Sequence, residues 1–221
     1  MNSLYIAFKS YSWLWDNKLE VAKISILVLL SILVYQFIAN GLLSMPIYFL
    51  SIWLASSSMV RLHRFILLDQ DKDSVEIFEK PSRTDFIYLL VWFSVFVAER
   101  IYEIAIENIG SYFGTFEIVI IILSVLVSIY IFGRIYMVFP AISVGKNLSF
   151  AWNLTNRRER VWLTIASTAI FMTPIYVVLI FLIFSLQPSS YLVWASIFIS
   201  LILINSHYSH LFKSFTVRKD K

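Results

Sequence analysis

The chain has 221 residues, of which 59% are hydrophobic, 17% are aromatic and only 14% are charged, with a formal net charge of +4. Soluble domains carry about 45–50% apolar and about 25% charged residues, so this composition excludes a disordered protein, a basic nucleic-acid-binding domain and an ordinary soluble enzyme. The absence of cysteine excludes disulfides, thiolate nucleophiles and cysteine-ligated metal centres. We therefore expect an all-α polytopic membrane protein that forms one domain.

Residues 1–20 are predicted to form an interfacial helix and not a cleavable signal. Leu4, Phe8, Tyr11 and Trp15 share one helical face in this segment. An apolar face with aromatic anchors is typical of a helix that lies in the plane of a membrane surface. The apolar run that follows is too long for the core of a signal peptide. We read it as the first retained span.

Six apolar stretches are long enough, or nearly so, to cross about 30 Å of hydrocarbon as helices. They cover residues 21–39, 42–60, 86–106, 118–139, 161–186 and 191–211. Backbone groups in lipid must be satisfied within the segment, so each stretch is predicted to be a transmembrane helix. A β-barrel would need alternating strands of about ten residues, a pattern that this sequence lacks.

Most basic residues lie next to the ends of these stretches that would share one side of the membrane. Sixteen of the 18 follow this rule: Lys9, Lys18, Lys23, Arg61, Arg64, Lys72, Lys80, Arg83, Lys146, Arg157, Arg158, Arg160, Lys213, Arg218, Lys219 and Lys221. Lys and Arg gather in the cytoplasmic loops of membrane proteins. We therefore predict a multi-pass protein of the bacterial cytoplasmic (inner) membrane with both termini in the cytoplasm.

Basic and aromatic side chains on the expected cytoplasmic side are candidate contacts for anionic lipid or a protein partner, including a second copy of the chain. Arg134 lies six residues before Pro140, close enough to the inner end of its span for the side chain to reach the headgroups. Trp152 belongs to a second amphipathic segment after Pro140. The candidate contacts are Arg61, Arg64, Arg134, Trp152, Arg157 and Arg158.

Glu99, Arg100 and Glu103 form a second candidate site. The third stretch is uncharged only as far as Ala98, so Glu99 and Arg100 are expected in the outer third of the bilayer. Charges at that depth suggest function, and Arg100 and Glu103 have the spacing of an i,i+3 pair. One hypothesis is the polar pathway of a small transporter or transporter subunit. The other is a helix that leaves the bilayer early and carries a solvated acidic rim.

The three histidines, His63, His207 and His210, are expected near the cytoplasmic face. Three imidazoles could bind a metal, or could act with Arg64 in an enzyme that works on lipids. They lie in no recognised catalytic or metal-binding motif, so interfacial anchoring is the simpler interpretation. We predict no metal, no cofactor and no catalytic residue.

Two segments carry a family resemblance. Residues 59–68 read MVRLHRFILL, and Arg134 is followed by Pro140-Ala141 and then by NLSFAWNLT over residues 147–155. They resemble a broad bacterial family of six-span membrane proteins. This family is related to the membrane domain fused to some glycerophosphodiester phosphodiesterases and to YciC-like inner-membrane proteins. Ala151 stands where that family usually has Ser. The resemblance implies a bacterial inner-membrane protein that accompanies lipid-related chemistry and does not perform it. The basic bias, the two interfacial segments and the lack of a catalytic motif lead us to expect a non-catalytic scaffold associated with lipid or a partner.

Overall fold

The computed structural model describes residues 3–38, 44–80, 82–113, 130–131, 133–185 and 191–217, together with positions 119, 123 and 127. Over these residues the chain is helical and contains no strand, which confirms the all-α prediction for this part of the chain. The elements are α1 (Ser3–Asp16), α2 (Lys18–Ile38), α3 (Ser44–Leu67), the short 3₁₀-helix η1 (Lys72–Ser74), α4 (Arg83–Phe113), α6 (Val138–Ser143), α7 (Leu148–Leu154), α8 (Arg158–Ser185) and α9 (Tyr191–Val217).

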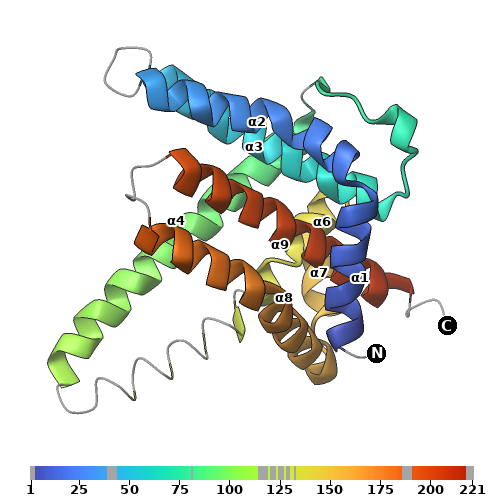
Figure 1. Ribbon diagram of the computed structural model, residues 1–221. Helices are drawn as coiled ribbons and strands as arrows, with labels where there is room; N and C mark the ends of the chain where they lie inside the picture. Colours follow the sequence, from blue (N-terminus) through green and yellow to red (C-terminus); the bar gives the residue numbers. More distant parts are fainter. Residues whose placement is uncertain are drawn as a thin grey trace.

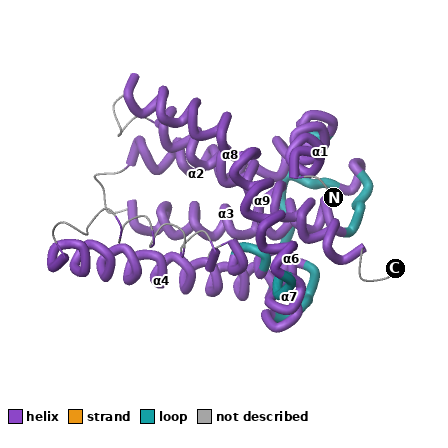
Figure 2. Tube along the Cα trace, turned by 90° about the horizontal axis from the view of Figure 1, so that it is seen from below, coloured by secondary structure: helices purple, strands orange, loops and turns teal. Residues whose placement is uncertain are grey.

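The long helices α2, α3, α4, α8 and α9 run between two ends of the molecule (Figure 1); α2, α4 and α8 lead away from one end, and α3 and α9 return to it. One end holds α1, the loop after α3, α6, α7 and both chain termini, and Figure 2 shows the same grouping from below. We call this the α1 end. Helix α1 runs crosswise to the long helices and packs on α8 and α9.

Among the described residues, two helices are long and apolar enough to cross a membrane. They are Glu159–Ser185 in α8 and Ala195–Thr216 in α9, which correspond to the fifth and sixth predicted spans. The first three predicted spans form helices α2, α3 and α4. Most of the fourth, residues 118–139, lies outside the described residues. The six-span arrangement therefore stays a prediction.

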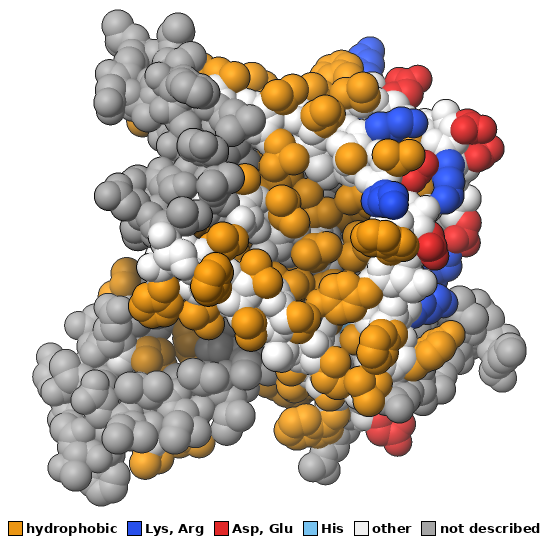
Figure 3. Space-filling view, in the orientation of Figure 1, with side chains coloured by type: hydrophobic (Ala, Val, Ile, Leu, Met, Phe, Trp, Pro, Cys, Tyr) orange, Lys and Arg blue, Asp and Glu red, His pale blue; other side chains and the backbone are white. Residues whose placement is uncertain are grey.

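The tightest packing lies toward the α1 end. Helix α6 is buried along its whole length, and it packs between α3, α4 and α9. Large buried side chains of the same region include Phe139 and Phe215. By contrast, Phe181 and Phe184 near the other end of α8 are 69% and 88% exposed. Figure 3 shows hydrophobic side chains over the middle of the molecule and the Lys, Arg, Asp and Glu side chains toward the α1 end.

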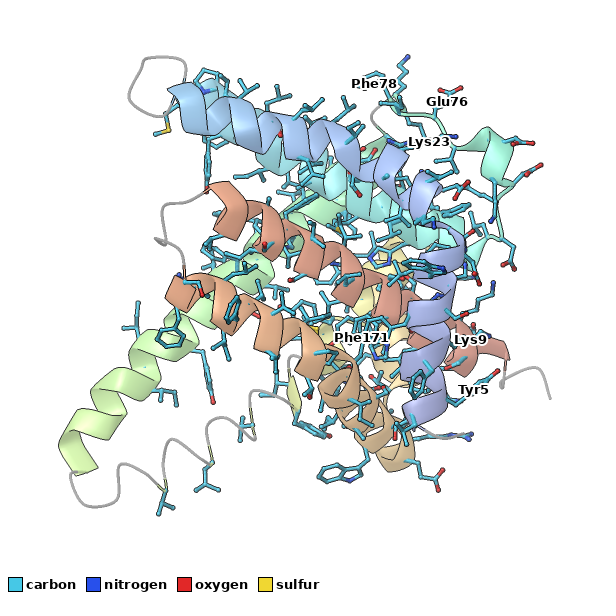
Figure 4. All side chains as sticks on the ribbon, viewed as in Figure 1. Tyr5, Lys9, Lys23, Glu76, Phe78 and Phe171 are labelled. Atoms are coloured by element: carbon cyan, nitrogen blue, oxygen red, sulfur yellow. The ribbon has the colours of Figure 1, made fainter. Side chains whose placement is uncertain are left out.

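Helix α1 forms as predicted, and its two faces have different surroundings. Leu4, Phe8 and Trp15 of the predicted aromatic face are 48%, 69% and 72% exposed. Tyr11 of the same face turns inward, where its hydroxyl donates a hydrogen bond of 2.6 Å to the backbone oxygen of Phe171. The opposite face packs on the bundle through the small or aliphatic residues Ile6, Ala7, Ser10 and Leu14. Figure 4 shows Phe171 of α8 facing α1.

Candidate functional site

Arg134 is buried close to the surface between two aromatic rings. Its side chain lies 3.9 Å from the ring centre of Trp152 and 5.8 Å from that of Tyr130, and these rings are themselves 45% and 47% exposed. The guanidinium donates hydrogen bonds of 3.3–3.4 Å to Thr155 Oγ1, Tyr130 Oη and the backbone oxygen of Trp152. All three acceptors are uncharged, so the buried positive charge has no carboxylate partner in the described part of the chain.

An apolar groove of about 540 Å³ lies beside this arginine. Its walls come from α4 and from α6 and α7, and its lining is Val91, Ser94, Val95, Ala98, Ile135, Val138, Leu148, Ser149 and Trp152. Trp152 thus contacts both the groove and the guanidinium of Arg134. Helix α7 holds the indole here because Asn147 caps its first turn, accepting a 2.8 Å hydrogen bond from the Phe150 backbone. A hydrocarbon chain in the groove would lie next to a cation.

The other candidate contacts fall into different environments. Arg61 is buried, forms a 3.2 Å ion pair with Glu79 and donates to the backbone oxygens of Glu76 and Ile77. Its charge is therefore used to hold the loop after α3, and we remove it from the proposed lipid contacts. Arg64 is half-buried, and its Nε donates a 2.9 Å hydrogen bond to the backbone oxygen of Ser143.

The remaining two arginines of the set precede or begin α8. Arg157 is exposed beside the start of the helix. The side chain of Arg158 lies outside the described residues. The structure therefore brings Arg134 and Trp152 into direct contact, and Arg157 is exposed immediately before α8.

Glu99 has a partner near the end of the fourth predicted span. Tyr136 Oη donates a 3.0 Å hydrogen bond to a carboxylate oxygen of the half-buried Glu99. Tyr136 also stacks on Tyr208 of α9, with ring centres 5.4 Å apart. Arg100 is exposed and lies 5.6 Å from the Phe96 ring centre. The side chain of Glu103 lies outside the described residues, so its predicted pairing with Arg100 is not tested.

The histidines lie at the α1 end, but each has its own surroundings. His63 contacts Ser209 Oγ at 2.6 Å and Tyr88 Oη at 3.1 Å. His207 contacts Ser10 Oγ at 3.1 Å, and His210 packs edge-on against Trp13. Within the described residues no three His, Asp or Glu side chains are grouped to hold a metal ion.

The short contact between His63 and Ser209 has the form of a base beside a hydroxyl nucleophile. Both residues are fully buried, and Ser209 Oγ already donates to the backbone oxygen of Asn205 at 3.0 Å. A substrate has no access to this hydroxyl in the structure. The pair therefore joins α3 to α9, and the geometry assigns it no catalytic role.

Sequence reasoning missed two residues that organise this region. Tyr88 Oη contacts His63 and donates to Asn205 Oδ1 at 3.2 Å, linking α3, α4 and α9. Tyr88 and Asn205 each sit in an apolar run, and a polar side chain within such a run was the available signal. Comparison of the chain with family models, curated proteins and solved structures yields no match.

Proposed function

We propose that the chain is a non-catalytic, multi-pass protein of the bacterial cytoplasmic membrane that binds anionic lipid at its α1 end. The proposal includes the six-span arrangement and membership of the family that the sequence resembles. A scaffold of this kind would hold lipid, or a partner bound to lipid, at the cytoplasmic surface.

The distribution of exposed side chains supports the membrane assignment. Large apolar side chains are exposed along α3, α4 and α8, such as Phe49 at 65%, Phe93 at 58% and Phe184 at 88%. A soluble monomer rarely exposes contiguous apolar patches of more than a few hundred Å². On the face shown in Figure 3 the Lys, Arg, Asp and Glu side chains lie toward the α1 end, where anionic headgroups would meet the basic ones.

The environment of Arg134 carries the lipid proposal. A buried charge is costly unless it is paired, and the acceptors around this guanidinium are neutral. Arginine forms paired hydrogen bonds with phosphate more readily than lysine does. A lipid phosphate above the exposed rings of Tyr130 and Trp152 would neutralise the charge, and an acyl chain would fill the groove beside it.

The test is a competition between lipids that differ only in head-group charge. The purified protein is incubated with equal amounts of phosphatidylglycerol and phosphatidylcholine in a neutral detergent, and native mass spectrometry records the bound lipid. We expect phosphatidylglycerol to be retained preferentially. Arg134→Gln should reduce this preference about tenfold, the scale of one or two charge-assisted hydrogen bonds.

The matched control is Arg83→Gln, which removes an exposed arginine at the start of α4. It should leave the preference within about twofold of the original protein, because exposed charges are well screened. Equal retention of the two lipids, or an Arg134→Gln protein that keeps its preference, would contradict the proposal. Arg134→Lys keeps the positive charge but loses the paired hydrogen bonds of the guanidinium. Its preference for phosphatidylglycerol should lie between those of the original protein and Arg134→Gln.

The transporter hypothesis has less support from the geometry. Glu99 would have to present its carboxylate to a passing solute, whereas that carboxylate accepts the hydroxyl of Tyr136. A transporter or transporter subunit with a polar pathway near Glu99, Arg100 and Glu103 remains the alternative proposal.

A further inference from the structure

A second cavity lies in the middle of the bundle, away from Arg134. It has a volume of about 460 Å³, within the range typical of small-molecule sites. Its lining comes from α2, α3, α4 and α9 and consists of Val28, Tyr48, Ser51, Ile52, Ala55, Ser56, Met59, Tyr88, Trp92, Ile197, Phe198, Leu201 and Asn205. The exposed members Tyr48, Trp92 and Leu201 mark its opening, and the buried members Val28, Met59 and Phe198 lie deep.

The shape of the cavity fits one hydrocarbon chain. Along α3 its lining extends from Tyr48 to Met59, which is about 16 Å of helix at 1.5 Å per residue. This length is about half of the 30 Å hydrocarbon thickness of a bilayer, the depth of one leaflet. The surfaces around the opening are apolar as well, so a lipid chain could enter from the side of the bundle.

Polar side chains line more than one part of the cavity. Tyr48 lies at the end far from Met59, and the hydroxyls of Ser51 and Ser56 donate to the backbone oxygens of Ile47 and Asp85. Two further polar side chains share the opposite end. Tyr88 and Asn205 line the end toward Met59, which is the end nearer the histidines and α1. The Asn205 amide accepts from Tyr88 and donates to the backbone oxygen of Leu201 at 2.7 Å. Because an amide has two donor hydrogens and two acceptor lone pairs, it keeps the capacity to bond a hydroxyl group.

None of the described residues that line the cavity is Lys, Arg, Asp or Glu. An ionised head group in this cavity would lose its hydration without gaining a counter-charge, which disfavours its binding. The cavity therefore selects against fatty acids and phospholipid phosphates and favours a neutral head with hydroxyl groups. A head at Asn205 and a chain toward Tyr48 would have the orientation of a lipid in the cytoplasmic leaflet.

We propose that this cavity binds the acyl chain and the neutral glycerol head of an acylglycerol, with Asn205 and Tyr88 contacting the hydroxyl groups. This inference rests on the membrane assignment of the proposed function, but not on the anionic-lipid site at Arg134. The two sites differ in the charge of the lipid they favour, in the helices that form them and in their lining residues.

The experiment uses a monoacylglycerol that carries a photoreactive diazirine in its acyl chain. The full-length protein is reconstituted into vesicles of phosphatidylcholine and phosphatidylglycerol with the probe, irradiated, digested and mapped by mass spectrometry. We expect labels within residues 48–59 and 197–205. Unlabelled 1-oleoylglycerol should remove them, whereas oleate and added phosphatidylcholine should not. Labels spread over the exposed face of α8 without competition would overturn the proposal and identify bulk lipid.

Two isoleucines of α9 give a matched pair of variants. Ile197→Trp replaces an aliphatic side chain of the lining by a bulky indole ring and should remove the labelling that 1-oleoylglycerol competes for. Ile199→Trp changes a 46% exposed residue of the same helix outside the lining, and should leave the labelling unchanged. Equal labelling of the two variants would overturn the proposal.

The head-group contact has its own variant. Asn205→Leu should weaken competition by 1-oleoylglycerol about fivefold to tenfold, the scale of one lost hydrogen bond, and leave competition by a plain long-chain alkane unchanged. If competition by the alkane weakened as much as competition by 1-oleoylglycerol, Asn205 would contribute packing only, and the head-group contact would be contradicted. Arg134→Gln, which tests the anionic-lipid site, should not change acylglycerol labelling, so failure of either proposal is recognised separately. Stronger competition by a long-chain quinone would overturn the choice of acylglycerol.

Discussion

The Oγ atom of Ser10 and the Nδ1 atom of His207 lie 3.1 Å apart, although 197 positions separate the two residues. The contact joins the crosswise helix α1 to α9. Ser10 Oγ also lies 2.9 Å from the backbone oxygen of Ile6. The hydroxyl has one proton, so both contacts are satisfied when it donates to Ile6 and the imidazole N–H donates to it. The opposite ring nitrogen of His207 has no hydrogen-bond partner among the described residues.

Removing this hydroxyl should loosen α1. We expect Ser10→Ala to lower the free energy of unfolding by about 1–2 kcal/mol, because both ring nitrogens of a buried His207 would then lack a partner. Thermal unfolding of the purified protein in detergent measures the effect. Ser12→Ala on the same helix is the control, since its hydroxyl makes only a 3.4 Å contact with Asp16. Equal stability of the two variants would contradict the assignment.

Tyr11 gives the attachment of α1 a pH dependence. Burial raises the pKa of its phenol above the ordinary value of 10.0. A raised pKa means that the folded protein favours the neutral phenol, so its contribution is complete below pH 10.0 and is lost as pH rises through the folded pKa. Wild-type protein should therefore lose more stability between about pH 9 and pH 11 than Tyr11→Phe does. Tyr5→Phe, which alters a 61% exposed tyrosine of the same helix, should behave as wild type.

Arg61 should control the loop after α3. Its ion pair with Glu79 and its bonds to the backbone of Glu76 and Ile77 join that loop to the helix. We expect Arg61→Gln to speed chymotrypsin cleavage beside Phe78 at least about fivefold, since more than 1 kcal/mol of local stability would be lost. The control Arg64→Gln breaks a contact with Ser143 instead and should leave the cleavage rate unchanged. Equal rates in all three proteins would show that other contacts hold the loop.

Sequence reasoning located the residues along the helices better than it located their partners. The segment of Leu4, Phe8 and Trp15 is a helix as predicted, and His207 contacts this helix through Ser10. The rotation of a helix about its axis depends on its neighbours, which is why the inward turn of Tyr11 was not predicted. Arg61 was a candidate lipid contact because it is basic, but a loop folded back over it. Such contacts between distant segments leave no local pattern in the sequence.

Glu99 illustrates the same limit and provides a fourth prediction. Its depth in the third span indicated a polar pathway, whereas its carboxylate accepts the hydroxyl of Tyr136. If this contact stabilises the bundle, the double-mutant cycle of Glu99→Ala and Tyr136→Phe should give a coupling energy of about 1 kcal/mol in unfolding measurements. A coupling energy near zero would favour the transporter alternative, in which Glu99 is free to meet a solute.

The last prediction concerns the predicted spans themselves. The chain has no cysteine, so a single introduced cysteine reports its own side of the membrane. Ser74 and Ser149 are exposed residues of the α1 end. Ser189 lies between the fifth and sixth predicted spans, in a connection that the six-span prediction places outside the cell. A membrane-impermeant maleimide applied to intact cells should label Ser189→Cys only, and permeabilised cells should allow labelling of all three cysteine variants.

The labelling of Ser149→Cys tests whether the fourth predicted span crosses the membrane. If residues 118–139 do not cross the bilayer while 86–106 do, position 149 lies outside and is labelled in intact cells. Labelling of Ser149→Cys without permeabilisation would therefore replace six spans by a different arrangement.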